Sequence, residues 1–168
     1  MFKSTCIVFF FLLLGACSPG DKKTETEARN KKTVQAYVDT IWNNKQLDSL
    51  EVFLSSTFLR KVNNIDLATD NVELTANINI LFTAFPDLHM DAEYIKASAN
   101  NVFMNWTISG TNTGNFSDQP ATGQKVKISG ITRYDLNDEG KITYVNLYYN
   151  ELSLMQQLGY ILTKPQIE

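Results

Sequence analysis

The second half of the chain alternates between apolar and more polar side chains, and no other feature constrains the fold as strongly. Four segments show this alternation, and turn-forming residues separate them. The repeating positions are Leu88, Met90, Ala92 and Tyr94; Val102, Met104, Trp106 and Ile108; Val126, Ile128, Thr132 and Tyr134; and Ile142, Tyr144, Asn146, Tyr148 and Asn150. Because successive side chains of a strand point to opposite faces, the pattern predicts strands with one packed face and one wetter face.

The segment before these strands has helical spacing instead. Its apolar residues are Val34, Tyr37, Val38, Ile41 and Trp42, which fall on one face of a helix. A short helix is expected within residues 47–54, and another is expected to begin at the capping residue Asp70 and to end before Pro86. A last helix is expected at 152–158. The sequence therefore predicts an α+β domain, with N-terminal helices packed on a curved, mainly antiparallel sheet.

Length and composition exclude several classes of protein. A chain of 168 residues with 43% hydrophobic residues is sufficient for one core, and a net charge of −3 argues against a nucleic-acid partner. The single histidine, His89, and the two cysteines, Cys6 and Cys17, make no cluster that would bind zinc or copper. We therefore expect no metal site.

The N-terminus has the features of a secretion signal. Lys3 precedes the apolar run at 7–14, which is much shorter than the roughly 20 residues of a membrane-spanning helix. The sequence Leu-Gly-Ala-Cys at 14–17 resembles the bacterial lipobox, whose cysteine is lipidated after cleavage. We therefore predict a lipoprotein signal peptide at 1–16 and a lipid anchor on Cys17. An ordinary signal peptide with a chance cysteine remains the alternative.

This prediction places the protein in the bacterial cell envelope, anchored to a membrane, and the outer membrane is favoured. Residues 18–30 contain one alanine and no larger apolar side chain. Such a segment buries little surface, so residues 17–30 are expected to be a lipidated cysteine and a flexible tether. The folded domain is expected to occupy residues 31–168.

Several short motifs of the domain occur in a characteristic order. They are Ala-Phe-Pro-Asp-Leu at 84–88, Trp-Thr-Ile-Ser-Gly-Thr-Asn-Thr-Gly-Asn-Phe at 106–116, Pro-Ala-Thr-Gly at 120–123, Gly130, Gly-Lys-Ile at 140–142 and Leu-Met-Gln-Gln-Leu-Gly at 154–159. The ordered set resembles the SnoaL-like polyketide (ester) cyclase family of the nuclear-transport-factor-2-like superfamily, over about residues 32–162. The resemblance implies a cone-like barrel around an apolar pocket, a homodimer, and aldol cyclisation without metal or cofactor.

The resemblance also implies positions for proton carriers. The family has a histidine after its Gly-Thr pair and an aspartate after its Gly-Ile pair, and these positions are Asn112 and Thr132 here. A carboxylate common near the end of the last strand corresponds to Asn150. Neither amides nor hydroxyls of threonine titrate in a useful range, so the usual acid and base of the reaction are missing.

The strand pattern and the resemblance together give a candidate ligand-binding site. Its residues are Trp106, Asn112, Thr132, Asn146, Tyr148 and Asn150, all expected to face the pocket. Aromatic, amide and hydroxyl groups suit a small, weakly polar molecule. The first hypothesis is therefore a membrane-anchored domain that binds such a ligand and catalyses no reaction.

Two alternatives remain open. A cyclase, hydrolase or isomerase would need another acid or base, such as Asp87, Glu93 or a tyrosine turned into the pocket. His89 is expected to face solvent, because its parity is opposite to that of Leu88 and Met90. In the third hypothesis, the chain is a pairing module that works through the outer face of its sheet, in a homodimer or a hetero-complex, which an exposed apolar patch would support.

Overall fold

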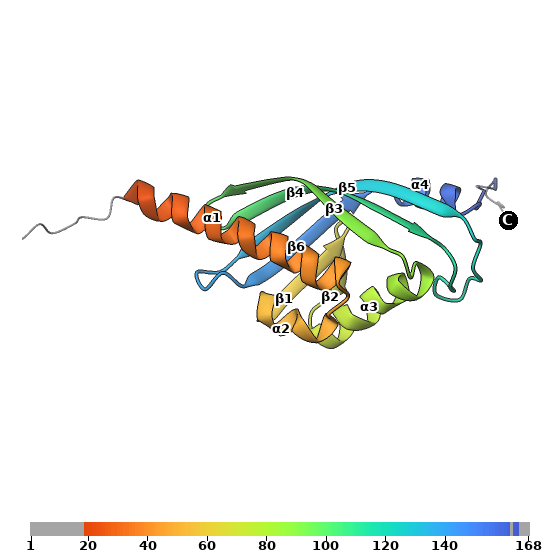
Figure 1. Cartoon of the computed structure of the whole chain (residues 1–168), viewed down its shortest axis with the longest axis horizontal. Coiled ribbons are helices and arrows are strands. Elements are labelled where there is room, and N and C mark those ends of the chain that lie inside the picture. Colours follow the sequence, from red (N-terminus) through yellow and green to blue (C-terminus); the bar gives the residue numbers. More distant parts are fainter. Residues whose placement is uncertain (1–18, 162, 165–168) are drawn as a thin grey trace, which may run out of the picture.

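The computed structural model describes residues 19–161 and 163–164. The helices are α1 (Pro19–Tyr37), η1 (Val38–Asn43, a π-helix), η2 (Leu47–Ser49), α2 (Leu50–Phe53), α3 (Asn71–Ala84) and α4 (Glu151–Gln157). The strands are β1 (Leu54–Val62), β2 (Ile65–Ala68), β3 (His89–Ser98), β4 (Asn101–Thr111), β5 (Lys125–Leu136) and β6 (Ile142–Tyr149) (Figure 1). The predicted signal peptide and Cys17 lie outside the described residues.

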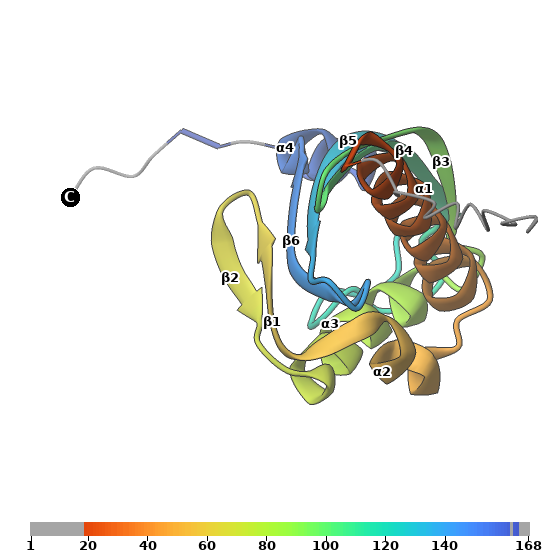
Figure 2. The same cartoon turned by 90° about the vertical axis from the view of Figure 1, so that its left-hand side faces the viewer.

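The strands form one six-stranded sheet in the order β2-β1-β6-β5-β4-β3. Every neighbouring pair is antiparallel except β1 and β6, which are parallel. Seen end-on, the sheet curves, and α1, α2 and α3 lie on its concave side (Figure 2). The predicted α+β class and curved, mainly antiparallel sheet are confirmed. The cone is completed by helices, because β2 and β3 do not pair to close the sheet.

The helical spacing read from the sequence matches the structure. All five apolar residues of the predicted N-terminal stripe are buried in the core, along α1 and η1. Helix α3 begins as predicted, because the Asp70 carboxylate accepts hydrogen bonds from the N–H groups of Val72 and Glu73 at 2.8 and 2.9 Å. It ends at Ala84, two residues before Pro86.

The flexible tether predicted before residue 31 is wrong for residues 19–30, which are helical in α1. The C-terminal part of this stretch docks on the domain. Asn30 is fully buried and donates to the Ala99 carbonyl, and Arg29 donates to the Asp138 carbonyl at 2.8 Å. Lysine, glutamate, alanine and arginine are good helix formers, so few apolar contacts are needed to extend the amphipathic helix backwards. The first turns of α1 project beyond the sheet (Figure 1).

The hairpin of β1 and β2 was not predicted from the sequence. Its turn consists of Asn63 and Asn64, which both have positive φ angles of 51° and 69°. This left-handed pair is typical of a two-residue hairpin turn, and asparagine tolerates it well. The hairpin matters for function, because β1 forms one wall of the interior.

The strand alternation holds along β5 but is interrupted in β3 and β6. In β6 the pairing runs from Asp135–Tyr144 directly to Leu136–Ile142, so Thr143 is an extra residue. Such a bulge reverses which face the following side chains point to. As a result Val145, and with it Leu147 and Tyr149, faces the interior.

No helix among residues 19–161 and 163–164 is long and apolar enough to cross a bilayer.

Candidate ligand-binding cavity

A cavity of about 290 Å³ lies between the concave side of the sheet and the helices. Apolar side chains from both layers form its walls, among them Ile78, Phe85, Leu88, Met90, Ile108 and Val126. Its size is at the lower end of the range for small-molecule pockets, and its mostly apolar lining is typical of them. The cavity is therefore the candidate functional site.

Trp106 and Thr132 line this cavity, as the sequence predicts. They lie on the neighbouring strands β4 and β5, where an unbroken register turns both side chains inward. The indole Nε1 of Trp106 donates to the Thr132 hydroxyl at 2.8 Å, and both residues are buried. A buried indole N–H without an acceptor would be costly, so this hydrogen bond fixes the orientation of the ring.

Gly130 makes room for that ring. A Cβ atom at this position would lie 2.3 Å from Cζ2 of Trp106 and 2.6 Å from the backbone carbonyl oxygen of Tyr148. Only glycine avoids both contacts without movement of the strand or the indole. The Gly130 motif of the sequence therefore has a steric role in shaping the cavity wall.

A polar cluster interrupts the apolar lining where α1, β1 and β5 meet. Arg60, Tyr37 and Tyr134 line the cavity and are only 5%, 1% and 3% exposed. The Arg60 guanidinium lies 5.2 Å above the ring of Trp42. Within the described residues, Nε of Arg60 has no hydrogen-bond partner and the Tyr37 hydroxyl has no acceptor, although contacts with Trp42 and Arg60 lower the pKa of Tyr37 against the larger effect of burial. The sequence predicts aromatic, amide and hydroxyl groups in the pocket, whereas the interior also contains a buried cation.

The tyrosines of the cavity are held in their protonated form. Burial raises the pKa of Tyr37 and of Tyr134, and the positive charge of Arg60 opposes this rise in both. Burial also raises the pKa of Tyr149, which lines the cavity from β6. Near neutral pH these hydroxyls are therefore hydrogen-bond donors and not bases.

Among the described residues that line the cavity, Glu151 is the one carboxylate. It is exposed and begins helix α4, so it lies at the rim and not in the interior. Asp87 and Glu93, the two carboxylates considered from the sequence, do not line the cavity. Backbone and side-chain hydrogen bonds from Thr111 lower the pKa of Asp87. Glu93 accepts a hydrogen bond from the Thr107 hydroxyl at 2.5 Å.

Asn112 is buried but does not line the cavity. Its Nδ2 donates to the carbonyls of Ala84 and Gly114 at 3.1 and 2.9 Å, and its Oδ1 accepts from the N–H and hydroxyl of Thr122. The prediction of a pocket residue fails here because β4 ends at Thr111, and alternation does not continue beyond a strand. The amide instead joins the end of α3 to the loop before β5.

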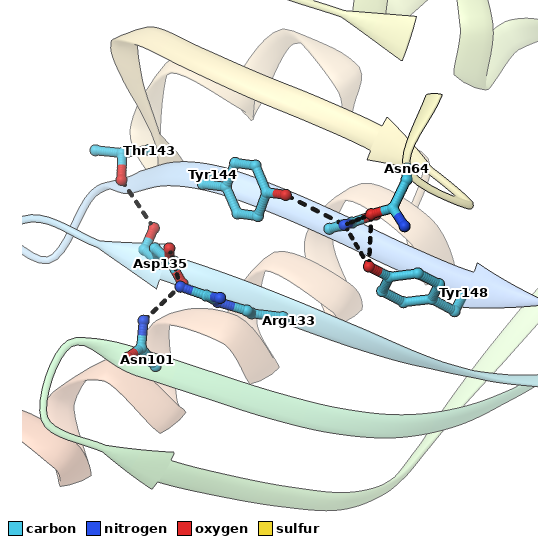
Figure 3. A network of polar contacts seen from close by, with 8 residues as sticks. Asn64, Asn101, Arg133, Asp135, Thr143, Tyr144 and Tyr148 are labelled. Atoms are coloured by element: carbon cyan, nitrogen blue, oxygen red, sulfur yellow. Dashed lines mark hydrogen bonds and ion pairs between the residues drawn. The ribbon is translucent and has the colours of Figure 1, made fainter. Parts of the chain in front are cut away.

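Asn146 and Tyr148 lie on the outer face of the sheet, away from the cavity. Nδ2 of Asn146 donates to Asn64 Oδ1 at 2.9 Å and to the Tyr148 hydroxyl at 2.8 Å, next to Tyr144 (Figure 3). The bulge at Thr143 accounts for this reversal of face. Asn150 is also outside the cavity lining, since its side chain caps α4 by accepting from the N–H of Ser153 at 3.0 Å.

The most polar residues of the cavity, Arg60 and Tyr37, were not singled out as site residues from the sequence. Tyr37 was assigned to the core by its helical spacing, and Arg60 lies in the strand that was not predicted. The Asn63-Asn64 turn between two short β-prone segments could have located that strand, and its alternation would then have turned Arg60 inward with Phe58. His89 faces solvent beside Asp91, as expected. Among the described residues, no three His, Cys, Asp or Glu side chains gather as metal ligands.

Comparisons with known proteins agree with this architecture. Among solved structures, a proposed SnoaL-like polyketide cyclase from Jannaschia sp. CCS1 has a TM-score of 0.74 at 22% identity, over 87% of this chain and 98% of its own. AclR, a proposed hydroxylase from Streptomyces galilaeus, has a TM-score of 0.72 at 22% identity, over 83% and 87%. TsrD from Streptomyces laurentii has a TM-score of 0.68 at 18% identity, over 79% and 96%. At these identities the similarity establishes the fold alone.

No curated protein matches the sequence. The model of the SnoaL-like polyketide cyclase family matches residues 32–158, which include every strand of the sheet and the whole cavity wall. Membership of this family supports a cyclase- or isomerase-type function or the binding of a ligand. The expected family is therefore confirmed, and the chain belongs to the SnoaL-like polyketide cyclases.

Proposed function

We propose that this protein is a membrane-anchored lipoprotein whose cavity binds a small, largely apolar molecule. One observation carries the proposal: an apolar cavity of about 290 Å³ whose buried polar groups are hydrogen-bond donors and not bases. Apolar walls favour a ligand through the loss of its hydrated surface, and a few polar groups set its orientation. The groups that line the cavity are therefore sufficient for binding.

Catalysis of the family type makes further demands. Removal of a proton next to a carbonyl requires a base within hydrogen-bond reach of the carbon that loses it. By the family resemblance, Asn112 and Thr132 correspond to the usual proton carriers, and Asn112 is outside the cavity lining. The buried tyrosines keep their protons, since burial raises their pKa. The interior is thus better suited to holding a molecule than to deprotonating it.

A ligand that co-purifies with the protein tests this proposal. Native mass spectrometry of the full-length chain should show a bound small molecule, and organic extraction should release it. Leu147→Trp fills the cavity from β6 and should abolish the adduct, whereas Ile131→Trp on the exposed outer face should keep it. Retention of the same molecule by Leu147→Trp would place the ligand elsewhere and contradict the proposal.

A second candidate function is a cofactor-free cyclase or isomerase, and the position of Glu151 favours it. This carboxylate lines the cavity mouth and could reach the acidic carbon of a ketone held inside. In D₂O such a base would exchange the α-protons of 2-decanone for deuterium, which NMR detects. Exchange that is faster than in buffer and is lost in Glu151→Gln would show that Glu151 acts as the base that this function requires. Equal rates with and without the protein would exclude Glu151 as the base.

The lipid anchor can be tested separately from the ligand. Cys17→Ser should move the protein from the membrane fraction to the soluble fraction, and a density gradient should assign the anchored form to the outer membrane. Helix α1 begins at Pro19, two residues after the proposed lipidated Cys17. A helix, and not a flexible tether, would therefore connect the lipid to the domain. Release of the unaltered chain from membranes by salt alone would argue against a lipid.

We also propose a homodimer that forms through the outer face of the sheet. Phe103, Ile131 and Tyr148 are exposed on this face, on the neighbouring strands β4, β5 and β6. Light scattering should give the mass of two chains, and Ile131→Glu should give the mass of one. A single-chain mass at all concentrations would exclude this dimer.

A further inference from the structure

We propose that the ligand is a lipophilic acid with a single carboxylate, and that Arg60 binds this carboxylate inside the cavity. The inference rests on the proposed ligand binding and adds the chemical class of the ligand. It follows from the position, the surroundings and the missing counter-ion of one side chain.

Arg60 is a buried cation without a carboxylate partner in residues 19–161 and 163–164. The ion pairs of that part of the chain involve other residues, such as Arg133 with Asp135 at 2.7 Å and Lys61 with Asp66 at 2.7 Å. Arg133 and Asp135 lie outside the core, where an ion pair contributes little. A charge removed from water and left unpaired is far more costly than a surface charge. A bound anion would remove this cost.

The groups around Arg60 are donors that suit an oxyanion. Trp42 supports the guanidinium plane from one side, at 5.2 Å. The Tyr37 hydroxyl is buried without an acceptor, and the charge of Arg60 lowers the pKa of both Tyr37 and Tyr134 against the effect of burial. The three polar groups therefore share one pocket, where the two oxygens of a carboxylate can accept from guanidinium and hydroxyl together.

The remaining surface limits the ligand to one charge. Of the described residues that line the cavity, Arg60 is the only Lys, Arg or His, so one negative charge is balanced there. A dianion such as a phosphate monoester would leave a second charge against apolar walls. Glu151 at the rim would repel a second carboxylate near the mouth. The other walls are apolar and would hold the hydrocarbon part.

Decanoic acid and 1-decanol form a matched pair of probes, with the same chain and different head groups. Isothermal titration calorimetry with the full-length protein at neutral pH should show the acid binding at least about 10-fold more tightly than the alcohol. Arg60→Met should weaken the acid by about 10–100-fold and change the alcohol by less than about 3-fold. Arg133→Met, which removes an arginine from the outer face, should leave both affinities unchanged.

The outcomes distinguish carboxylate binding by Arg60 from ligand binding in general. Equal affinity for acid and alcohol in the unaltered protein, or an Arg60→Met variant that keeps the acid, overturns the carboxylate inference and leaves ligand binding intact. If neither probe binds, and the cavity-filled Leu147→Trp variant likewise gives no heat of binding, both the carboxylate inference and the proposed ligand binding are overturned. The comparison of acid and alcohol uses the unaltered protein, so it tests the inference even if Arg60→Met does not fold.

Discussion

The indole N–H of Trp106 donates a 2.8 Å hydrogen bond to the hydroxyl of Thr132 on the adjacent strand, inside the cavity. Thr132→Val keeps the shape of the side chain and removes the acceptor. Since a buried donor is then left unpaired, we expect the free energy of unfolding to fall by about 1–3 kcal/mol. Urea denaturation followed by tryptophan fluorescence measures this change. Thr132→Ser retains the hydroxyl and should lose less; equal losses in both variants would show that the hydrogen bond contributes nothing.

Gly130 lies where a methyl group would meet the Trp106 ring at 2.3 Å. Gly130→Ala should therefore lower the free energy of unfolding by about 1–3 kcal/mol through overpacking. The near-UV circular dichroism of the indole should change as the ring moves. Val72→Ala, at an exposed position on α3, is the control and should alter neither quantity. An unchanged spectrum and stability in Gly130→Ala would mean that the ring has room to move.

Alkaline pH should destabilise the protein through its buried tyrosines. The folded-state pKa of Tyr37 and of Tyr134 is raised above the unfolded value of about 10. Above about pH 10 the unfolded chain releases protons that the native state retains, so stability is full below this pH and declines as the pH rises further. Thermal unfolding across this range should show the decline. The double variant Tyr37→Phe, Tyr134→Phe should show a shallower decline, and an identical slope would exclude these residues as its source.

Arg60 should reduce the stability of the ligand-free protein. Replacing a buried, unpaired charge by an apolar side chain of similar length is often stabilising, although the contact with Trp42 is lost. We expect Arg60→Met to raise the free energy of unfolding by about 1 kcal/mol, which corresponds to a rise of about 2–4 °C in Tm. Arg133→Met should instead lower the free energy of unfolding slightly, because the ion pair with Asp135 is lost. A marked loss of stability in Arg60→Met would show that the cation supports the empty fold.

Asn112 should prove to be a structural residue. In Asn112→Asp, a carboxylate faces the carbonyls of Ala84 and Gly114, which the amide group had satisfied. We expect a loss of about 2–4 kcal/mol near neutral pH, smaller at acid pH, where the introduced group is protonated and can donate again. Chemical denaturation at two pH values measures this difference. A pH-independent loss would contradict the hydrogen-bonding account, and Asn115→Asp in the same loop is the control.

The sequence was informative where one periodicity runs without interruption. The stripe from Val34 to Trp42 and the inward set of β5 around Thr132 are placed as predicted, because each residue of a regular element fixes the direction of the next. The capping residue Asp70 and the helix-breaking Pro86 predicted the two ends of α3 in the same way. These features need only local information.

The site was less predictable because its key positions depend on irregular or distant pairing. A single extra residue at Thr143 moved Asn146 and Tyr148 to the outer face, and alternation alone cannot reveal such a bulge. Arg60 faces the cavity because β1 joins β6, which is more than 80 residues further along the chain. A positive side chain in a short, mixed strand has no local signature of burial.

The parallel pairing of β1 with β6 also determines when the interior can form during synthesis. Arg60 lies opposite Val145 in this ladder, so the wall that carries the cation must wait until nearly the whole chain has left the ribosome. Before that, β1 has only the short β2 as a neighbour. In a nascent chain arrested ahead of residue 142, β1 and β2 should consequently remain protease-sensitive.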